Sequence, residues 1–110
     1  MDPVVDQLEA YNERDIDRFL SCYDPNVKME DGDGNLLMQG HEAMRAQYSA
    51  LFDASPNLHA HLMSRIRVGD YVIDEEDVTG RIADGFPDKV HAVAIYQVDA
   101  EKITHVRFLM

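Results

Sequence analysis

The sequence has one cysteine, Cys22, no tryptophan, and only 10 lysine and arginine residues among its 110. A single cysteine cannot form an intrachain disulfide or a cysteine metal cluster, and a reducing compartment fits this composition. The few basic residues stand against 21 acidic ones, which gives a formal net charge of -11. Such a charge repels nucleic acid and anionic membrane surfaces. The sequence therefore predicts neither a nucleic-acid-binding nor a membrane-binding protein.

Long hydrophobic runs and export signals are also missing. No apolar stretch approaches the roughly 20 residues of a membrane-spanning helix, and no basic segment followed by an apolar run opens the chain. Hydrophobic residues make up 45% of the 110, a composition typical of a globular protein with a single core. We therefore expect one domain over residues 1–110, soluble and located in the cytoplasm.

The spacing of apolar residues predicts helices first and strands afterwards. Asp2 and Pro3 form a good helix start, and Asp24-Pro25 is expected to end the second helix. The predicted helices cover residues 4–12, 16–23 and 41–52. Period-two alternation predicts strands over residues 58–68, 71–79, 90–98 and 103–109, with a loop at 80–89. This order favours an α+β fold, with the helices gathered on one face of an antiparallel sheet.

A hairpin turn at residues 69–70 sets a register for the two strands beside it. The register places Arg65 opposite Asp74 and Met63 opposite Glu76, so that the charged residues share one face. Arg65 is then expected to pair with Glu76 or Asp74, and such a structural ion pair is favoured for Glu76 over the role of a catalytic acid. The other face is more apolar and is expected to meet the helices: Leu62, Ile66, Val68, Tyr71 and Ile73.

Residues 27–44 carry the main candidate for chemistry. A turn cluster at 32–35, rich in glycine, aspartate and asparagine, separates two short strands. Alternation places Asp31 on the same strand face as Val27 and Met29. A carboxylate in this position is either a turn former at the strand end or a base held against a pocket. The pattern alone favours the turn former and leaves both open.

Histidines and tyrosines are the other candidates. His59 and His61 share a strand face, but no third ligand is fixed beside them, so we predict no metal site. Without a phosphate-binding glycine-rich loop, or a serine or cysteine nucleophile motif, we expect no cofactor. Four tyrosines lie on apolar stripes, where core packing explains them and a pocket for a flat apolar ligand would explain them equally. They are Tyr11, Tyr23, Tyr48 and Tyr96.

Several short motifs occur in a characteristic order along the chain: Tyr11-Asn12, Arg14-Asp15-Ile16, residues 27–34, residues 40–48 and Ala94-Ile95-Tyr96. With this order, nearly the whole chain resembles a SnoaL-like, ketosteroid-isomerase-like domain of the nuclear-transport-factor-like superfamily. The resemblance implies a cone-shaped α+β fold, in which a curved antiparallel sheet wraps over three helices around a deep apolar pocket. It also implies a homodimer.

The resemblance carries over to individual residues only in part. Asp31 matches the general base of ketosteroid isomerases, and Tyr23 and Tyr48 match two supporting tyrosines. Gln7 stands where those enzymes have the oxyanion tyrosine, and Ala94 where they have a protonated aspartate. Losing one oxyanion donor costs about 10²–10³ in rate, and both are replaced here. We therefore expect negligible steroid isomerisation.

Two functions of different class remain open. In the first, the domain binds a small hydrophobic, carbonyl-containing molecule and acts as an isomerase, lyase or cyclase with Asp31 as general base. The ligand-binding residues of that pocket are then Gln7, Tyr11, Tyr23, Tyr48, Ala94, Tyr96 and Phe108. In the second, the chain is a noncatalytic binding or interaction module with a vestigial pocket. We expect a homodimer through the sheet face of His91, Val93, Ile95 and Gln97.

Overall fold

The structure is a computed structural model that describes residues 2–83, 85 and 87–110. Its helices are α1 (Pro3–Glu13), α2 (Ile16–Ser21) and α3 (Gly40–Ala54). Its strands are β1 (Tyr23–Glu30), β2 (Leu36–Gln39), β3 (His59–Val68), β4 (Tyr71–Thr79), β5 (Lys89–Asp99) and β6 (Lys102–Leu109). The predicted α+β class is confirmed. Residues 84 and 86 of the predicted loop lie outside the described residues.

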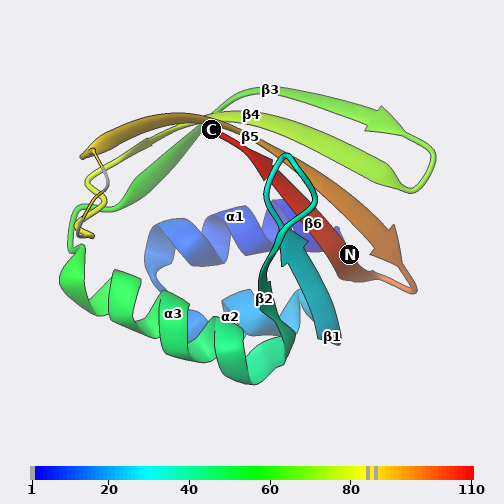
Figure 1. Cartoon of the computed structure of the whole chain (residues 1–110), viewed down its shortest axis with the longest axis horizontal. Coiled ribbons are helices and arrows are strands. Elements are labelled where there is room, and N and C mark those ends of the chain that lie inside the picture. Colours follow the sequence, from blue (N-terminus) through cyan, green and yellow to red (C-terminus); the bar gives the residue numbers. More distant parts are fainter. Residues whose placement is uncertain (1, 84, 86) are drawn as a thin grey trace.

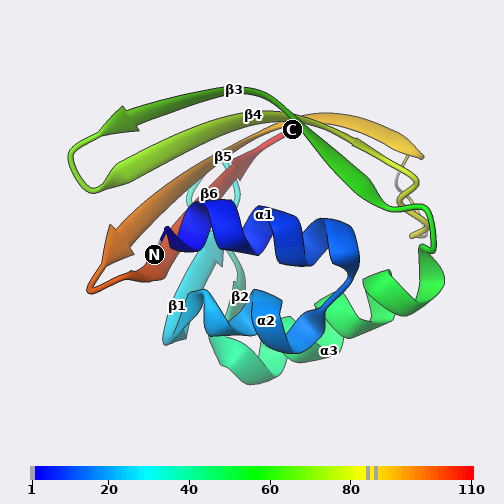
Figure 2. The same ribbon diagram turned by 180° about the vertical axis from the view of Figure 1, so that it is seen from behind.

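The six strands form one sheet in the order β2-β1-β6-β5-β4-β3. The sheet curves over the helices, with α1 beneath it and α2 and α3 on the far side of α1 (Figures 1 and 2). Neighbouring strands are antiparallel except β1 and β6. The last strand, β6, lies beside β1 and runs parallel to it. The cone-shaped fold is thus confirmed, with one parallel pair in a sheet that we expected to be wholly antiparallel.

The helix starts follow the capping chemistry of the sequence. The carboxylate of Asp2 accepts hydrogen bonds from the backbone N–H groups of Val4 and Val5, at 3.0 and 3.3 Å. The second helix, however, ends at Ser21 and not at Asp24-Pro25. Pro25 lies inside β1, in the stretch between Tyr23 and Lys28 where the pairing with β6 is irregular. A residue without an N–H is tolerated there because no regular ladder bond is lost.

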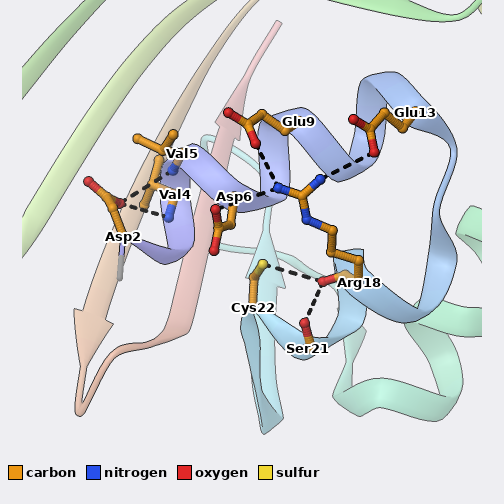
Figure 3. A network of polar contacts seen from close by, with 9 residues as sticks. All are labelled: Asp2, Val4, Val5, Asp6, Glu9, Glu13, Arg18, Ser21 and Cys22. Carbon is orange, nitrogen blue, oxygen red and sulfur yellow. Dashed lines mark hydrogen bonds and ion pairs between the residues drawn. The ribbon is translucent and has the colours of Figure 1, made fainter.

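An ion-pair cluster joins the first two helices at the surface. Arg18 of α2 lies 2.6 Å from Glu9, 3.2 Å from Glu13 and 3.6 Å from Asp6, all on α1 (Figure 3). The three carboxylates recur every three or four residues and therefore share one side of α1. Exposed pairs of this kind contribute about 0–1 kcal/mol each, so they orient α2 more than they stabilise it.

A register shift in β3 changes which side chains face the helices. The shift lies between Leu62 and Ser64. Before it, Ala60 is buried, whereas after it Ile66 and Val68 are 56% and 61% exposed. One extra residue in a strand sends every later side chain to the opposite face. Our prediction that Ile66, Val68 and the tip of this hairpin meet the helices was therefore wrong.

The inner face of β4 is correspondingly more polar than predicted. Val72, Asp74, Glu76 and Val78 alternate along the strand and are all buried. The shift in β3 also corrects the pairing, because Leu62 and not Met63 lies opposite Glu76. Two carboxylates thus enter the core side by side on one strand.

None of the described helices is long and apolar enough to cross a membrane.

Candidate active site

A cavity of about 290 Å³ lies between the inner face of the sheet and the helices. Side chains from α1, α2, α3, β1, β2, β4, β5 and β6 line it. Every residue that the sequence suggested for ligand contact lies on its wall: Gln7, Tyr11, Tyr23, Tyr48, Ala94, Tyr96 and Phe108. The structure therefore brings these residues from distant parts of the chain to one space.

Asp31 is not part of that wall. Its carboxylate accepts hydrogen bonds from the backbone N–H groups of Asp33 and Asn35, both at 2.9 Å, and from the side-chain amide of Asn35 at 3.0 Å. The hydrogen bonds from Asn35 are the main reason that the pKa of Asp31 lies below its usual range. A carboxylate engaged in this way organises the β1–β2 turn. Its position gives no support to the role of base in the cavity.

Glu76 is the carboxylate that lines the cavity. Only 9% of the residue is exposed, and its Oε1 atom has no hydrogen-bond partner in the part of the chain that the structure describes. The pKa of Glu76 is raised to about 7, mainly by burial and in addition by the negative charge of Asp74. Glu76 therefore changes protonation state near neutral pH in an apolar surrounding.

Arg65 pairs with Asp74 and not with Glu76. Its Nε and Nη2 atoms donate to the two carboxylate oxygens of Asp74, at 2.7 and 2.8 Å. The predicted position of Arg65 opposite Asp74 and its pairing across the two strands are confirmed, and of the two expected partners, Glu76 and Asp74, it is Asp74 that takes the arginine. The two-pronged geometry uses both oxygens of the fully buried Asp74. The positive charge of Arg65 is thus committed, although it still lowers the pKa of Glu76 in part.

A chain of buried hydrogen bonds runs along the opposite end of the wall. The hydroxyl of Tyr23 donates to the amide oxygen of Gln7 at 3.0 Å, and the amide nitrogen of Gln7 donates to the hydroxyl oxygen of Tyr96 at 3.1 Å. Tyr96 therefore acts here as an acceptor, and no hydrogen bond of the described residues uses its own proton. Burial raises the pKa of Tyr96 well above its usual value, so this hydroxyl stays protonated as a donor.

Small residues separate the two polar ends of the wall. On β5, Ala92 lies opposite Glu76 and Ala94 opposite Asp74, whereas Tyr96 lies further along, opposite Val72. Four residues of a strand span about 13 Å, and the methyl side chains between leave room above the sheet. The charge of Glu76 contributes to the raised pKa of Tyr96, so both side chains act on the space above these alanines.

Aromatic rings close the cavity from the helix side. The rings of Tyr11, Phe19 and Tyr48 line it, and their centroids lie 4.8 to 6.4 Å apart. Burial raises the pKa of Tyr48 to about 12, and its hydroxyl donates to the sulfur of Met29 at 3.8 Å. These rings offer a flat apolar surface with hydroxyl groups at its edge.

The cavity opens beside β2 and the loop before β5. Leu37 and Met110 are largely exposed and yet line the cavity, so they mark its open side together with Arg81. The loop is held at its base, where the backbone N–H of Ile82 donates to the hydroxyl of Ser55 at 2.9 Å. Gly80 has a φ of +74° and lies against Asn57, where a Cβ atom would come within 2.2 Å of the carbonyl oxygen.

Histidines lie elsewhere. His91 contacts Glu75 on the outer face of the sheet at 2.7 Å, and His59 and His61 are exposed. In the described part of the chain, no group of three or more histidine, cysteine, aspartate or glutamate side chains is placed to hold a metal ion.

Glu76 lines the cavity, whereas our sequence reasoning favoured a structural ion pair for it over a catalytic role. The signal was present, because Val72 and Val78 flank the two carboxylates at period two and so mark the buried face of β4. The alternation showed which residues of β4 share a face. Whether that face points toward the helices depended on the register shift in β3.

Comparison with known proteins places this geometry in a family. The SnoaL-like domain family matches residues 4–106. An uncharacterised cystatin-fold protein from Novosphingobium aromaticivorans is 27% identical, with a TM-score of 0.88 and coverage of 100% of this chain and 99% of that one.

More distant structures share the fold. A proposed polyketide cyclase from Sinorhizobium meliloti is 20% identical, with a TM-score of 0.78 and coverage of 96% and 92% of the two chains. An LEH-like epoxide hydrolase from M. tuberculosis is 15% identical, with a TM-score of 0.80 and coverage of 97% and 78%. No curated protein matches the chain. The match over residues 4–106 and the cone-shaped fold agree, and the chain belongs to the SnoaL-like domain family.

Proposed function

We propose that the cavity binds a small hydrophobic molecule with a carbonyl group, and that Glu76 exchanges a proton with the carbon beside that carbonyl. The observation that carries the proposal is the carboxylate of Glu76, which lines an apolar cavity and has an oxygen without a hydrogen-bond partner among the described residues. A pKa of about 7 leaves this carboxylate partly ionised at neutral pH and makes it a stronger base than an exposed one.

The proposed step uses Glu76 and Tyr96 together. Glu76 takes a proton from the α-carbon, the electron pair of that C–H bond forms an enolate, and Tyr96 donates a hydrogen bond to the enolate oxygen. Return of the proton to another carbon gives isomerisation, and attack of the enolate on an electrophilic carbon of the same ligand gives cyclisation. Tyr96 suits the role of donor because Gln7 occupies its oxygen as a donor and leaves its proton for the ligand.

The proteins with similar folds are compatible with this function, but they are not the evidence for it. A polyketide cyclase and an epoxide hydrolase are by name enzymes that act on small molecules, and the structures so described share the fold at 20% and 15% identity. Identities this low carry the fold alone. The choice of Glu76 and Tyr96 rests on the contacts within this chain.

The test is hydrogen–deuterium exchange at the α-carbon of a hydrophobic ketone such as 2-tetralone, followed by NMR in D₂O. The wild-type protein should accelerate exchange, and Glu76→Gln should lose about 10²-fold or more of that acceleration. Asp31→Asn removes a carboxylate outside the cavity and should keep the wild-type rate. Loss of exchange in Asp31→Asn, with exchange retained in Glu76→Gln, would return the role of base to Asp31 and reject the proposal.

A noncatalytic binding module is the second candidate, and the state of Gln7 favours it. Gln7 stands where the resembled isomerases have an oxyanion tyrosine, and both ends of its amide are engaged by Tyr23 and Tyr96. One of its two amide N–H groups is thus committed to Tyr96, and the other is a weaker acid than the tyrosine hydroxyl that it replaces. Binding of the ketone with no acceleration of exchange in the wild-type protein would select this function.

We also propose that the protein is a homodimer that pairs through the outer face of the sheet. The face carries exposed or half-buried apolar side chains that none of the described helices covers: Ile66, Val68, Tyr71, Ile73, Val93 and Ile95. Such a row is typical of a face that pairs with another copy. Light scattering should give twice the monomer mass, and Ile95→Arg should reduce it. A monomer mass at high concentration would contradict the proposal.

A further inference from the structure

We infer that the cavity also takes a hydrophobic ammonium ion, with the carboxylate of Glu76 as its counter-ion. This inference rests on the first half of the proposed function, a cavity that holds a small molecule, and does not depend on proton transfer. Glu76 is about nine-tenths buried, and its Oε1 atom lacks a hydrogen-bond partner within the described ranges. A buried carboxylate is best satisfied by a ligand that brings both N–H donors and a positive charge.

The cation on the strand beside Glu76 is committed to another carboxylate. The neighbouring cation, Arg65, directs two N–H donors to the two oxygens of Asp74, at 2.7 and 2.8 Å. Arg65 and Asp74 thus neutralise each other, and the negative charge of Glu76 remains. The adjacent side chains of the sheet are Leu62 on β3 and Ala92 on β5, neither of which can donate a hydrogen bond.

The aromatic wall of the cavity favours a cation as well. Tyr11, Phe19 and Tyr48 form one cluster of rings in the cavity wall, and the centroids of Phe19 and Tyr48 lie 4.8 Å apart. The faces of aromatic rings carry partial negative charge and attract ammonium groups, while the methylene groups of the ion pack against the same rings. A carboxylate beside such a cluster resembles in its chemistry the sites that hold alkylammonium ions.

The charge of the whole protein acts in the same direction. A formal net charge of -11 attracts cations and repels anions, which raises the local concentration of an amine at the surface. Arg81 acts in the opposite direction, because it lines the cavity and carries a positive charge. An anionic ligand held by Arg81 is therefore the competing outcome, and the test must contain one.

The test compares three probes of similar size and different charge: phenethylamine, its neutral counterpart 2-phenylethanol, and the anion 3-phenylpropanoate. Calorimetry or ligand-observed NMR at pH 8 measures their affinities, since Glu76 is ionised and the amine protonated there. The wild-type protein should bind the amine about tenfold more tightly than the alcohol. In Glu76→Gln that preference should fall to near unity, because the amine loses its counter-ion. Glu75→Gln, which removes a charge on the outer face, should keep the preference.

The outcomes separate this inference from the proposed function. Equal binding of amine and alcohol, tighter binding of 3-phenylpropanoate, or a preference that survives Glu76→Gln would each overturn the inference. In all three cases binding of the neutral alcohol still supports a ligand cavity. If no probe binds the wild-type protein, both the inference and the binding half of the proposed function are rejected. The three-probe comparison on the wild-type protein needs no variant to fold.

Discussion

The β1–β2 turn and the inner face of β4 each present a carboxylate, and the two carboxylates behave in opposite ways. Asp31 accepts three hydrogen bonds from Asp33 and Asn35, and these donors hold its pKa low. Glu76 lies in an apolar wall with one oxygen lacking a partner among the described residues, and burial raises its pKa to about 7. Surrounding donors, and not the match to a motif, decide which carboxylate is available for chemistry.

The largest effect should come from breaking the ion pair of Asp74 with Arg65. Asp74 is a buried carboxylate like Glu76, but it has this arginine as a partner. Arg65→Ala leaves Asp74 buried and uncompensated, so we expect a loss of about 3–5 kcal/mol in the free energy of unfolding. Urea denaturation measures it. The control is Arg67→Ala, which breaks the more exposed pair with Asp2 and should cost less than about 1 kcal/mol. Equal losses in the two variants would mean that burial does not distinguish the pairs.

A somewhat smaller effect of opposite sign should follow from Glu76→Gln. The folded state of the wild type holds a proton on Glu76 up to a pKa of about 7, whereas the unfolded state releases it near 4.5. The unfolded state therefore binds fewer protons over this range, and stability falls as the pH rises from 4.5 to 7. Glutamine stays neutral, so Glu76→Gln should be more stable by about 3 kcal/mol at pH 8.

Thermal or urea unfolding at pH 4 and pH 8 checks this, because the advantage of Glu76→Gln should disappear at pH 4. Glu75→Gln on the outer face is the control and should give no gain. A Glu76→Gln variant less stable than the wild type at pH 8 would mean that the carboxylate has a partner in the folded state, and the contrast with Asp31 would be lost.

The smallest effect should come from Asp31→Asn. The hydrogen bonds to Asp33 and Asn35 favour the ionised form, so they stabilise the fold above the unfolded-state pKa of Asp31 and this contribution is lost as the pH falls through the lowered folded-state pKa. Asp31→Asn should therefore destabilise at pH 7, by less than Arg65→Ala, and the difference should vanish in acid. Urea unfolding measures this, and an unchanged midpoint at pH 7 would remove the role of Asp31 in the turn.

Much of the fold could be predicted because local signals sufficed. Asp2 at the start of α1 and the turn at residues 69–70 follow from capping and turn chemistry that neighbouring residues settle. The shift between Leu62 and Ser64 could not be predicted, because β3 keeps its alternating pattern through it. It is defined by pairing with β4, and it moved Ile66 and Val68 outward and Arg65 inward.

The sequence by itself determined the family, the order of elements, and the set of tyrosines and small residues that line the cavity, since these depend on side-chain type and periodicity. Only the tertiary structure decided which acidic side chain faces the cavity. Asp31 and Glu76 are both carboxylates on strands, and their difference arises from what surrounds them. Donors from a nearby turn satisfy Asp31, whereas Asp74 takes the arginine for which the sequence left two partners open, Glu76 and Asp74. Desolvation and the competition for one cation are properties of the packed chain.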